Sequence, residues 1–439
     1  MAMKKNVFLM FDYFLITAVL ALVTMGILFI YSSSVNSDGL SVTNEYIKQI
    51  IWAGIGLVIM ILATLYDYRK FESISIWFYL GLIIVLIYTR IFGRLVNGAR
   101  SWIGIGEIGI QPSEFGKVFY IMFLARYLDI SQNEIPLKRF IVATGIMLLP
   151  MGLILIQPDM GTASVYLPIF LIMCFIAGIP LRYILYVLSF GMLTIVIAIL
   201  PVWNSQILTT PLRVITILTE MKFRLLLIST MGIITLVGIV VRRYYKGSRY
   251  IYWITYVFSI LFLSLIFSLL LNKVLQDYQI KRLIVFLDPN SDPLGTGWNI
   301  IQSKIAIGAG GISGQGYLNG SQSHYRFLPQ QSTDFIFSIL SEEFGFIGGI
   351  IVFSLYLFIL LRILYIIRKC PNKYGANIAA GIFGMFAFHF FINVGMVMGI
   401  MPITGIPLIF LSYGGSSLLS SMLCIGLLMS INFRRKDLY

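Results

Sequence analysis

Long apolar blocks separated by short polar connections dominate the sequence. A helix needs about 20 apolar residues to cross the hydrocarbon core of a bilayer, and blocks near that length recur along the chain. We expect each block to form a membrane helix, and the first is too long for the core of a signal peptide. The blocks are residues 11–31, 49–66, 74–92, 114–128, 140–157, 162–179, 183–200, 223–241, 251–271, 334–367, 376–398 and 405–431.

The overall composition agrees with a membrane protein. Of 439 residues, 59% are hydrophobic and 11% are charged, and the mean hydropathy is +0.91. A soluble domain of this length needs more charge on its surface. We therefore predict an all-α, polytopic integral membrane protein that forms a single transmembrane domain over residues 1–439.

The net charge of +14 has a membrane explanation. Basic residues gather in alternate connections, as loops on the cytoplasmic side do, so no nucleic-acid partner is expected. The pattern predicts that both termini are cytoplasmic. The basic connections are "DYRKFES", "LKRF", "RRYYKGSR", "IRKCPNK" and the tail "FRRKDLY", and two connections without a basic residue are "QPDMGT" and "GIMPITGIP".

Two segments on the opposite, outer side differ from the other connections. Thr89–Lys117 carries several arginines, and the predicted extracytoplasmic loop over residues 272–333 is long, polar and rich in glycine. A long loop in a compact protein is typically functional or disordered. Because this loop also contains many Ile, Leu, Phe and Trp residues, we expect short helices on the membrane surface.

Asp334 stands where the loop "RFLPQQST" meets an apolar block. One interpretation is helix capping, with Thr333 as the N-cap and an acid in the first turn. The other is that Asp334 opens a polar stripe, which in a membrane helix must face the protein interior or a wet cavity. In an outer-leaflet cleft, its carboxylate can act as a general base. Within about 40° of Asp334 on a helix lie Ser338, Ser341 and Gly345, and within about 80° lies Glu342.

Glu114 and Lys117 lie three residues apart on one face of a predicted helix. They either neutralise each other as an ion pair, or Lys117 meets an anionic headgroup while Glu114 positions it. Arg94, Arg100 and Trp102 lie just upstream, and guanidinium groups beside an aromatic ring suit a ligand with phosphate and sugar groups. Trp102 alone is also typical of an interfacial aromatic belt.

Other polar positions favour structural interpretations. Asp159 in "QPDMGT" either shapes a tight turn or belongs to the outer site, and the turn is favoured. The small residues of "FLSYGGSSLLSS" favour close helix packing. His389 and Asn393 are expected to be satisfied interior residues. The sequence contains no metal-ligand cluster, and "IGAGGISGQG" does not join a strand to a helix as a dinucleotide site requires.

Several motifs, in order along most of the chain, resemble the SEDS family of bacterial cell-wall proteins (shape, elongation, division and sporulation), and its elongation branch most of all. The resemblance implies ten transmembrane helices with a large outer loop before the eighth. It also implies a peptidoglycan glycosyltransferase that polymerises lipid II and works with a class B penicillin-binding protein and other elongation-machinery membrane proteins. The motifs are "NGARSWIGIGEIGIQPSEFGK", "QPDMGT", "NIIQSKIAIGAGGISGQG", "TDFIFSILSEEFGFIGG" and "GIMPITGIPLIFLSYGGSS".

The resemblance also assigns roles to residues. It implies that Asp334 is the essential acid and that the pairs Glu114 with Lys117 and Arg100 with Trp102 belong to the site. The sequence departs from the family at Gln330, where the family has Glu, and at Ser332, where it often has His, so neither is required for proton transfer.

A larger departure is that three apolar runs stand where the family needs one. We predict twelve helices, ten shared and two added, with the inserted pair in residues 183–250; a reentrant or surface-lying pair is the alternative.

The implied reaction is one inverting displacement, in which Asp334 takes the proton of the acceptor 4-hydroxyl. We expect Lys117, Arg100 and Arg282 to stabilise the departing undecaprenyl pyrophosphate, and Asp159 and Glu342 to contribute to substrate binding. No cofactor is expected, although a divalent cation (Mg²⁺ or Mn²⁺) is an alternative source of charge. A lipid II flippase and a non-catalytic scaffold are the competing functions; transporters usually bind their substrate near the midplane, which favours the enzyme.

Overall fold

The computed structural model describes residues 11–36, 39–96, 98–105, 108–206, 212–245, 248–274 and 277–435. It divides the chain into two compact units. The first combines Met1–Ile179 with Asn299–Tyr439, and the second is Pro180–Trp298.

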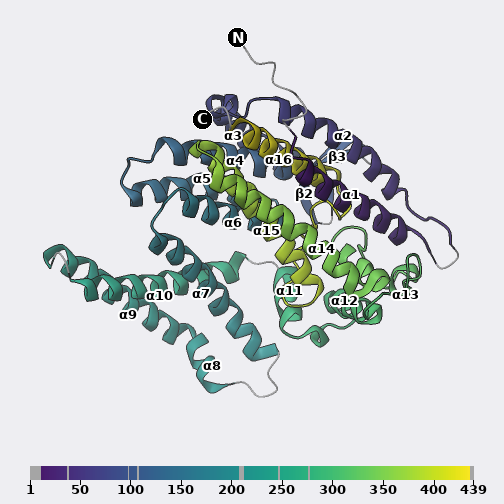
Figure 1. Cartoon of the computed structure of the whole chain (residues 1–439). Coiled ribbons are helices and arrows are strands. Elements are labelled where there is room, and N and C mark those ends of the chain that lie inside the picture. Colours follow the sequence, from purple (N-terminus) through teal and green to yellow (C-terminus); the bar gives the residue numbers. More distant parts are fainter. Residues whose placement is uncertain are drawn as a thin grey trace, which may run out of the picture. The chain divides into compact units, whose positions relative to one another are not determined.

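The first unit is helical apart from one small antiparallel sheet in the order β1-β2-β3 (Figure 1). Helix α15 is largely buried and packs against α4, α6 and α14. The elements are α1 (Tyr13–Ser34), α2 (Glu45–Leu65), α3 (Lys70–Phe92), β1 (Arg94–Val96), β2 (Ala99–Ile105), β3 (Ile108–Ile110), α4 (Pro112–Ile130), α5 (Pro136–Ile156), α6 (Met160–Ile176), α13 (Ser321–His324), α14 (Ile336–Lys369), α15 (Lys373–Val397) and α16 (Gly415–Arg434).

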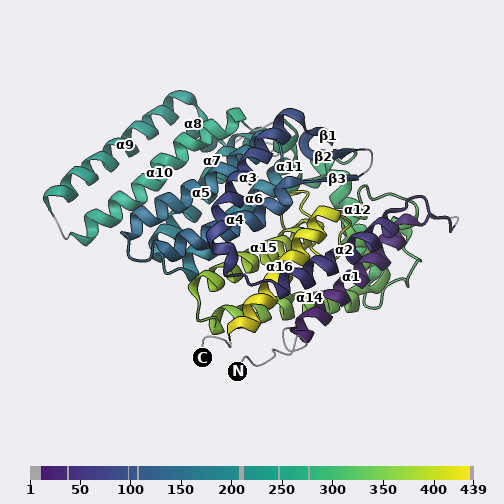
Figure 2. The same ribbon diagram turned by 90° about the horizontal axis from the view of Figure 1, so that it is seen from above.

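In the second unit, α10 packs against both α7 and α9 (Figure 2). Gly232 of α9 lets the ring of Phe262 approach closely, and Arg224 donates a hydrogen bond of 2.9 Å to Ser268. The elements are α7 (Leu181–Gln206), α8 (Arg213–Thr219), α9 (Met221–Tyr244), α10 (Arg249–Val274), α11 (Asp277–Leu287) and the 3-10 helix η2 (Pro289–Ser291); α12 (Thr296–Gly310) begins at its end.

The predicted all-α membrane fold is confirmed. Among the described residues, 10 helices are long and apolar enough to cross a membrane, namely α1, α2, α3, α5, α7, α9, α10, α14, α15 and α16. Helices α4 and α6 coincide with the remaining two predicted blocks, and α6 is a shorter apolar helix. Short helices also form in the predicted loop 272–333, as expected, while its side of the membrane and the origin of residues 183–250 as an insertion stay predictions.

The prediction for the last block was wrong at its beginning. The predicted helix 405–431 starts only at Gly415, and residues 402–414 form no helix or strand. A proline, Pro407, lacks the backbone N–H that a helix needs, and Gly405 has a φ of 70° that most residues avoid. These residues therefore interrupt the helix although their side chains are apolar.

This irregular segment, residues 402–414, is held by side chains from helices α2, α14 and α15. Such backbone survives at membrane depth only where the protein itself supplies hydrogen-bond partners. The pairs are Asn393 to the carbonyl of Ile406 (2.8 Å), His389 to that of Pro407 (2.9 Å), Tyr356 to that of Ile409, and Gln49 to that of Ser412 (3.2 Å).

A second interruption lies inside α14, which the sequence predicted as one run over 334–367. Gly345 has φ 62° and ψ −155°, so the helix breaks there. The glycine-rich segment after α12 repairs the break, because it supplies partners for the backbone groups on both sides. The bonds are Phe346 N–H to Gly311 (2.9 Å), Ile347 N–H to Ile312 (3.2 Å), and the N–H groups of Gln315 and Gly316 to Glu342 and Glu343 (both 3.0 Å).

The irregular segment leaves no room at Gly26 of α1. A Cβ at Gly26 would stand 2.7 Å from the carbonyl oxygens of both Phe410 and Leu411, whereas one at Gly54 of α2 would meet nothing within 4 Å. We expect Gly26→Ala to lower the free energy of unfolding by about 1–3 kcal/mol through overpacking. Gly54→Ala, the matched control, should stabilise the helix by about 0.5–1 kcal/mol. Denaturant unfolding in detergent measures both, and equal responses would contradict the close packing.

Candidate functional site

Asp334 lies in a turn immediately before α14 and is half-buried. The N-cap of α14 is Phe335, and the hydroxyl of Thr333 donates to the carbonyl of Gln330 (3.2 Å). The capping interpretation with Thr333 as N-cap is therefore wrong. Because Asp334 precedes the helix, the predicted helical angles between Asp334 and the polar residues of α14 are wrong as well. The stripe itself faces the protein interior, as its members Ser338, Ser341 and Glu342 are buried.

Helix α15 connects Asp334 to Lys117 through two side chains. Asn393 donates to the backbone carbonyl of Asp334 (2.9 Å), and His389, one turn earlier, contacts the ammonium of Lys117 (3.2 Å). Positions four residues apart lie on one helix face and differ by about 6 Å along the axis. The backbone of Asp334 and the ammonium of Lys117 thus rest on successive turns of α15.

Lys117 and Glu114 form a buried ion pair. The two atoms are 2.8 Å apart, and the side chains are only 1% and 6% exposed, respectively. The carbonyl of Pro407 lies 2.9 Å from Nδ1 of His389. Because a carbonyl only accepts, Nδ1 carries the proton, and the lone pair of Nε2 is left to accept from Lys117. The irregular segment therefore fixes the histidine tautomer that holds the lysine.

Asp159 caps the N-terminus of α6. Its carboxylate accepts from the backbone N–H of Thr162 (3.0 Å), as the turn interpretation implies, and also from the side chain of Gln111 (2.7 Å). Burial raises the pKa of Asp159, and the bonds from Thr162 oppose that rise. A Cβ at Gly161 would stand 2.6 Å from the carbonyl of Thr404, so this cap also lies against the irregular segment.

Arg100 and Trp102 both belong to strand β2. They lie two residues apart and therefore on the same face of the strand, where Arg100 is exposed and Trp102 is half-buried. A Cβ at Gly109 would stand 3.1 Å from the indole ring of Trp102, so the ring covers β3. The strand pairing places Arg94 opposite Trp102.

The other two predicted site residues have different surroundings. Glu342 is fully buried, and its carboxylate accepts from the N–H of Gln322 (2.8 Å) and the hydroxyl of Ser321 (3.2 Å). It therefore fastens the short helix α13 to α14. Arg282 belongs to the second unit, where it lies half-buried on α11.

A family model described as cell cycle protein, covering FtsW, RodA and SpoVE, matches residues 13–222 and 206–437. The chain belongs to this family. A relative from Treponema pallidum named peptidoglycan glycosyltransferase RodA is 56% identical over 425 residues, which cover 97% of this chain and 98% of the relative. Escherichia coli K12 peptidoglycan glycosyltransferase MrdB is 31% identical over 427 residues, covering 97% and 95%.

Solved structures support the SEDS fold. A chain of the structure described as "Structural coordination of polymerization and crosslinking by a peptidoglycan synthase complex" matches with a TM-score of 0.67 at 24% identity, covering 98% of both chains. Thermus thermophilus rod shape determining protein RodA matches with a TM-score of 0.60 at 21% identity, covering 97% of both.

Two residues that connect Lys117 with Asp334 are not identified as site residues from the sequence. His389 and Asn393 were expected to be satisfied interior residues, and both are hydrogen-bonded, but their partners are Lys117 and Asp334. Their spacing of four residues on one face of an apolar helix was the available signal.

The divalent cation stays a prediction, because Mg²⁺ is usually held by one or two carboxylates together with substrate phosphates rather than by a cage of protein ligands. No group of three or more His, Cys, Asp or Glu side chains in the part of the chain that the structure describes could hold a metal ion. Glu114 and Asp159 instead accept hydrogen bonds or an ion pair from neighbouring side chains.

Burial of the Lys117–Glu114 ion pair predicts a large loss of stability when one partner is removed. Glu114→Gln leaves the ammonium of Lys117 buried without its counter-charge, so the free energy of unfolding should fall by about 3–5 kcal/mol. A further Lys117→Met change should restore much of that loss. The control is Glu134→Gln, which removes the exposed pair with Lys138 (42% and 64% exposed) and should cost at most about 1 kcal/mol.

Unfolding in denaturant and detergent provides the comparison. Equal losses for Glu114→Gln and Glu134→Gln would contradict the burial of the Lys117 pair.

Proposed function

We propose that the chain is a peptidoglycan glycosyltransferase that polymerises lipid II into β-1,4 glycan strands and releases undecaprenyl pyrophosphate, for cell elongation and rod shape. Its membership of the SEDS family and the names of relatives that match nearly its whole length support this activity. The observation that carries the assignment to a site is the backbone anchor of Asp334 on Asn393.

The proposed location is the bacterial cytoplasmic membrane, with both termini inside and the site outside. The alternation of basic and uncharged connections supports this orientation. On the same topology, residues 272–333 lie outside, and Asp334 stands at the outer boundary of α14.

Asp334 is proposed as the general base. Its carboxylate takes the proton from the acceptor's 4-hydroxyl as that oxygen attacks the anomeric carbon of the donor sugar. The bond from the anomeric carbon to the pyrophosphate oxygen breaks in the same displacement, and the configuration inverts. Asn393 donates to the backbone carbonyl of Asp334, so this anchor positions the residue without using its carboxylate.

The leaving pyrophosphate carries negative charge that must be stabilised. We assign the first contact to Arg100, which is exposed on strand β2, with Trp102 on the same strand to contact a sugar ring. Lys117 is committed to Glu114 and His389, so its proposed role is to hold the part of α15 on which Asp334 rests. Direct contacts of Lys117, Asp159, Glu342 or Arg282 with substrate stay predictions.

The proposed partner is a class B penicillin-binding protein, with other elongation-machinery membrane proteins. One solved relative belongs to a peptidoglycan synthase complex that coordinates polymerization and crosslinking, which supports a partnership of this kind.

The decisive variant is Asp334→Asn, which keeps the side-chain shape and the backbone carbonyl that Asn393 binds. We expect polymerisation of purified lipid II in detergent to fall by at least about 10²-fold, the usual range for loss of a general base. The melting temperature should match that of the unchanged protein, and Glu134→Gln should retain full activity. Glycan products are read on a denaturing gel.

The same assay separates the competing functions. A flippase has no membrane to cross in detergent, and a scaffold forms no glycan, so polymerisation by the unchanged protein excludes both as its sole function. Normal glycan synthesis by Asp334→Asn would refute the assignment of the base.

A further inference from the structure

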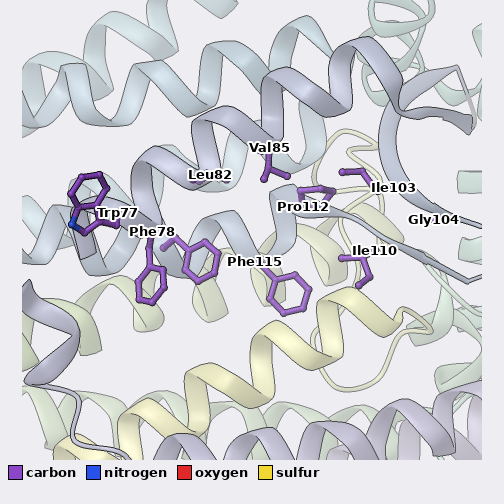
Figure 3. A pocket seen from close by; sticks show the side chains of 11 residues that line it. Trp77, Phe78, Leu82, Val85, Ile103, Gly104, Ile110, Pro112 and Phe115 are labelled. Atoms are coloured by element: carbon purple, nitrogen blue, oxygen red, sulfur yellow. The ribbon is translucent and has the colours of Figure 1, made fainter. Parts of the chain in front are cut away.

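A large apolar groove lies along α3 and α4 and ends at strands β2 and β3, which form the hairpin (Figure 3). Its volume is about 830 Å³, and its lining consists only of apolar and glycine residues. The walls include Trp77 and Phe78 of α3 and Phe115 and Phe119 of α4, and Ile103 of β2 covers one end. No residue that lines it carries a charge.

The groove and the proposed site share two elements. On α4, Phe115 and Phe119 lie four residues apart on one face, and Glu114 and Lys117 lie on another. On β2, Ile103 faces the groove, whereas Arg100 belongs to the opposite face, three residues earlier. One helix and one strand therefore present hydrocarbon to one side and charge to the other.

This arrangement matches an amphiphile with an anionic head and one long hydrocarbon tail. We propose that the groove binds the isoprenoid chain of the lipid-linked substrate, with its diphosphate held near Arg100. The inference rests on the proposed function. Charge complementarity at the hairpin end favours a prenyl diphosphate over a bulk phospholipid, and the continuous apolar lining excludes a polar ligand.

The proposal predicts that affinity depends on tail length. Each isoprene unit that enters the groove removes apolar surface from its surroundings and adds contacts with the aromatic walls. A substrate with a short tail, such as a geranyl chain, reaches the hairpin end but not Trp77 and Phe78. Undecaprenyl substrate reaches them, so only the long chain benefits from the deep part of the groove.

Gly81 allows a direct test. It lines the groove, and a Cβ there would meet nothing within 4 Å, so Gly81→Leu projects into the empty space. Gly54 of α2 also has nothing within 4 Å of its Cβ position but lies outside the groove, which makes Gly54→Leu the matched control. Both changes replace a helical glycine with the same side chain.

The measured quantity is the ratio of kcat/KM for undecaprenyl-linked to geranyl-linked lipid II. We expect Gly81→Leu to lower this ratio about tenfold, the effect of excluding two methylene-sized groups. Gly54→Leu should leave the ratio at the unchanged protein's value. An unaltered ratio in Gly81→Leu would overturn the proposal.

A second measurement uses the unchanged protein and does not depend on the folding of any variant. Undecaprenyl phosphate with a photoreactive diazirine on an inner isoprene unit, about 15 Å from the phosphate, should label the peptide that contains Trp77 and Phe78, because the groove extends for about two helical turns along α3. Excess undecaprenyl phosphate should compete, and phosphatidylglycerol vesicles should not. Labelling confined to other helices, or equal competition by phosphatidylglycerol, would contradict the proposal and indicate a partner helix or bulk lipid in the groove.

The two proposals fail in different ways. If the unchanged protein makes no glycan from lipid II, the proposed function fails, whereas photolabelling still reports whether the groove binds the isoprenoid. If glycan forms but the labelling and the tail-length ratio ignore the groove, only the further inference fails.

Discussion

Backbone hydrogen bonding at membrane depth is the constraint on which the structure depends. Hydrocarbon supplies no partners, so each interruption of a helix must be repaired by the protein. Residues 402–414 are held by side chains of three helices, and the break at Gly345 is repaired by the glycine-rich segment after α12. Both repairs use chain segments that lie far apart in the sequence.

The repairs also position the polar groups of the site. The two α15 side chains that hold the irregular segment, His389 and Asn393, are the same ones that contact Lys117 and Asp334. A buried polar group that serves two partners is costly to alter, because either partner is then left unsatisfied. The same two side chains therefore position Asp334 and stabilise the membrane fold.

Much of the fold follows from apolar block length alone. Each predicted block falls on a helix, because crossing a bilayer requires a certain number of apolar residues whatever their identity. The two errors, at 405–431 and at Gly345, arise because hydropathy does not detect a broken helix whose side chains stay apolar. Gly405, Pro407 and Gly345 were the visible signals.

The part of the site that depends on local helical spacing could be predicted from the sequence. Glu114 and Lys117 pair across a spacing that a helix dictates, so their contact could be predicted locally. The link from Lys117 to Asp334 needed α15, and nothing local to either residue indicates that helix. The glycine-rich run supplies backbone partners on both sides of Gly345, which lies in another helix, so its role required the tertiary structure.

The central claim is that a carboxylate anchored through its backbone on α15 meets the acceptor sugar while a cation on the hairpin meets the diphosphate. An experimental structure with a bound, non-reacting lipid II analogue tests it most directly. The account predicts the acceptor 4-hydroxyl within hydrogen-bond distance of the Asp334 carboxylate and the donor diphosphate against Arg100. An acceptor hydroxyl bound by other residues, with Asp334 contacting protein alone, would contradict it.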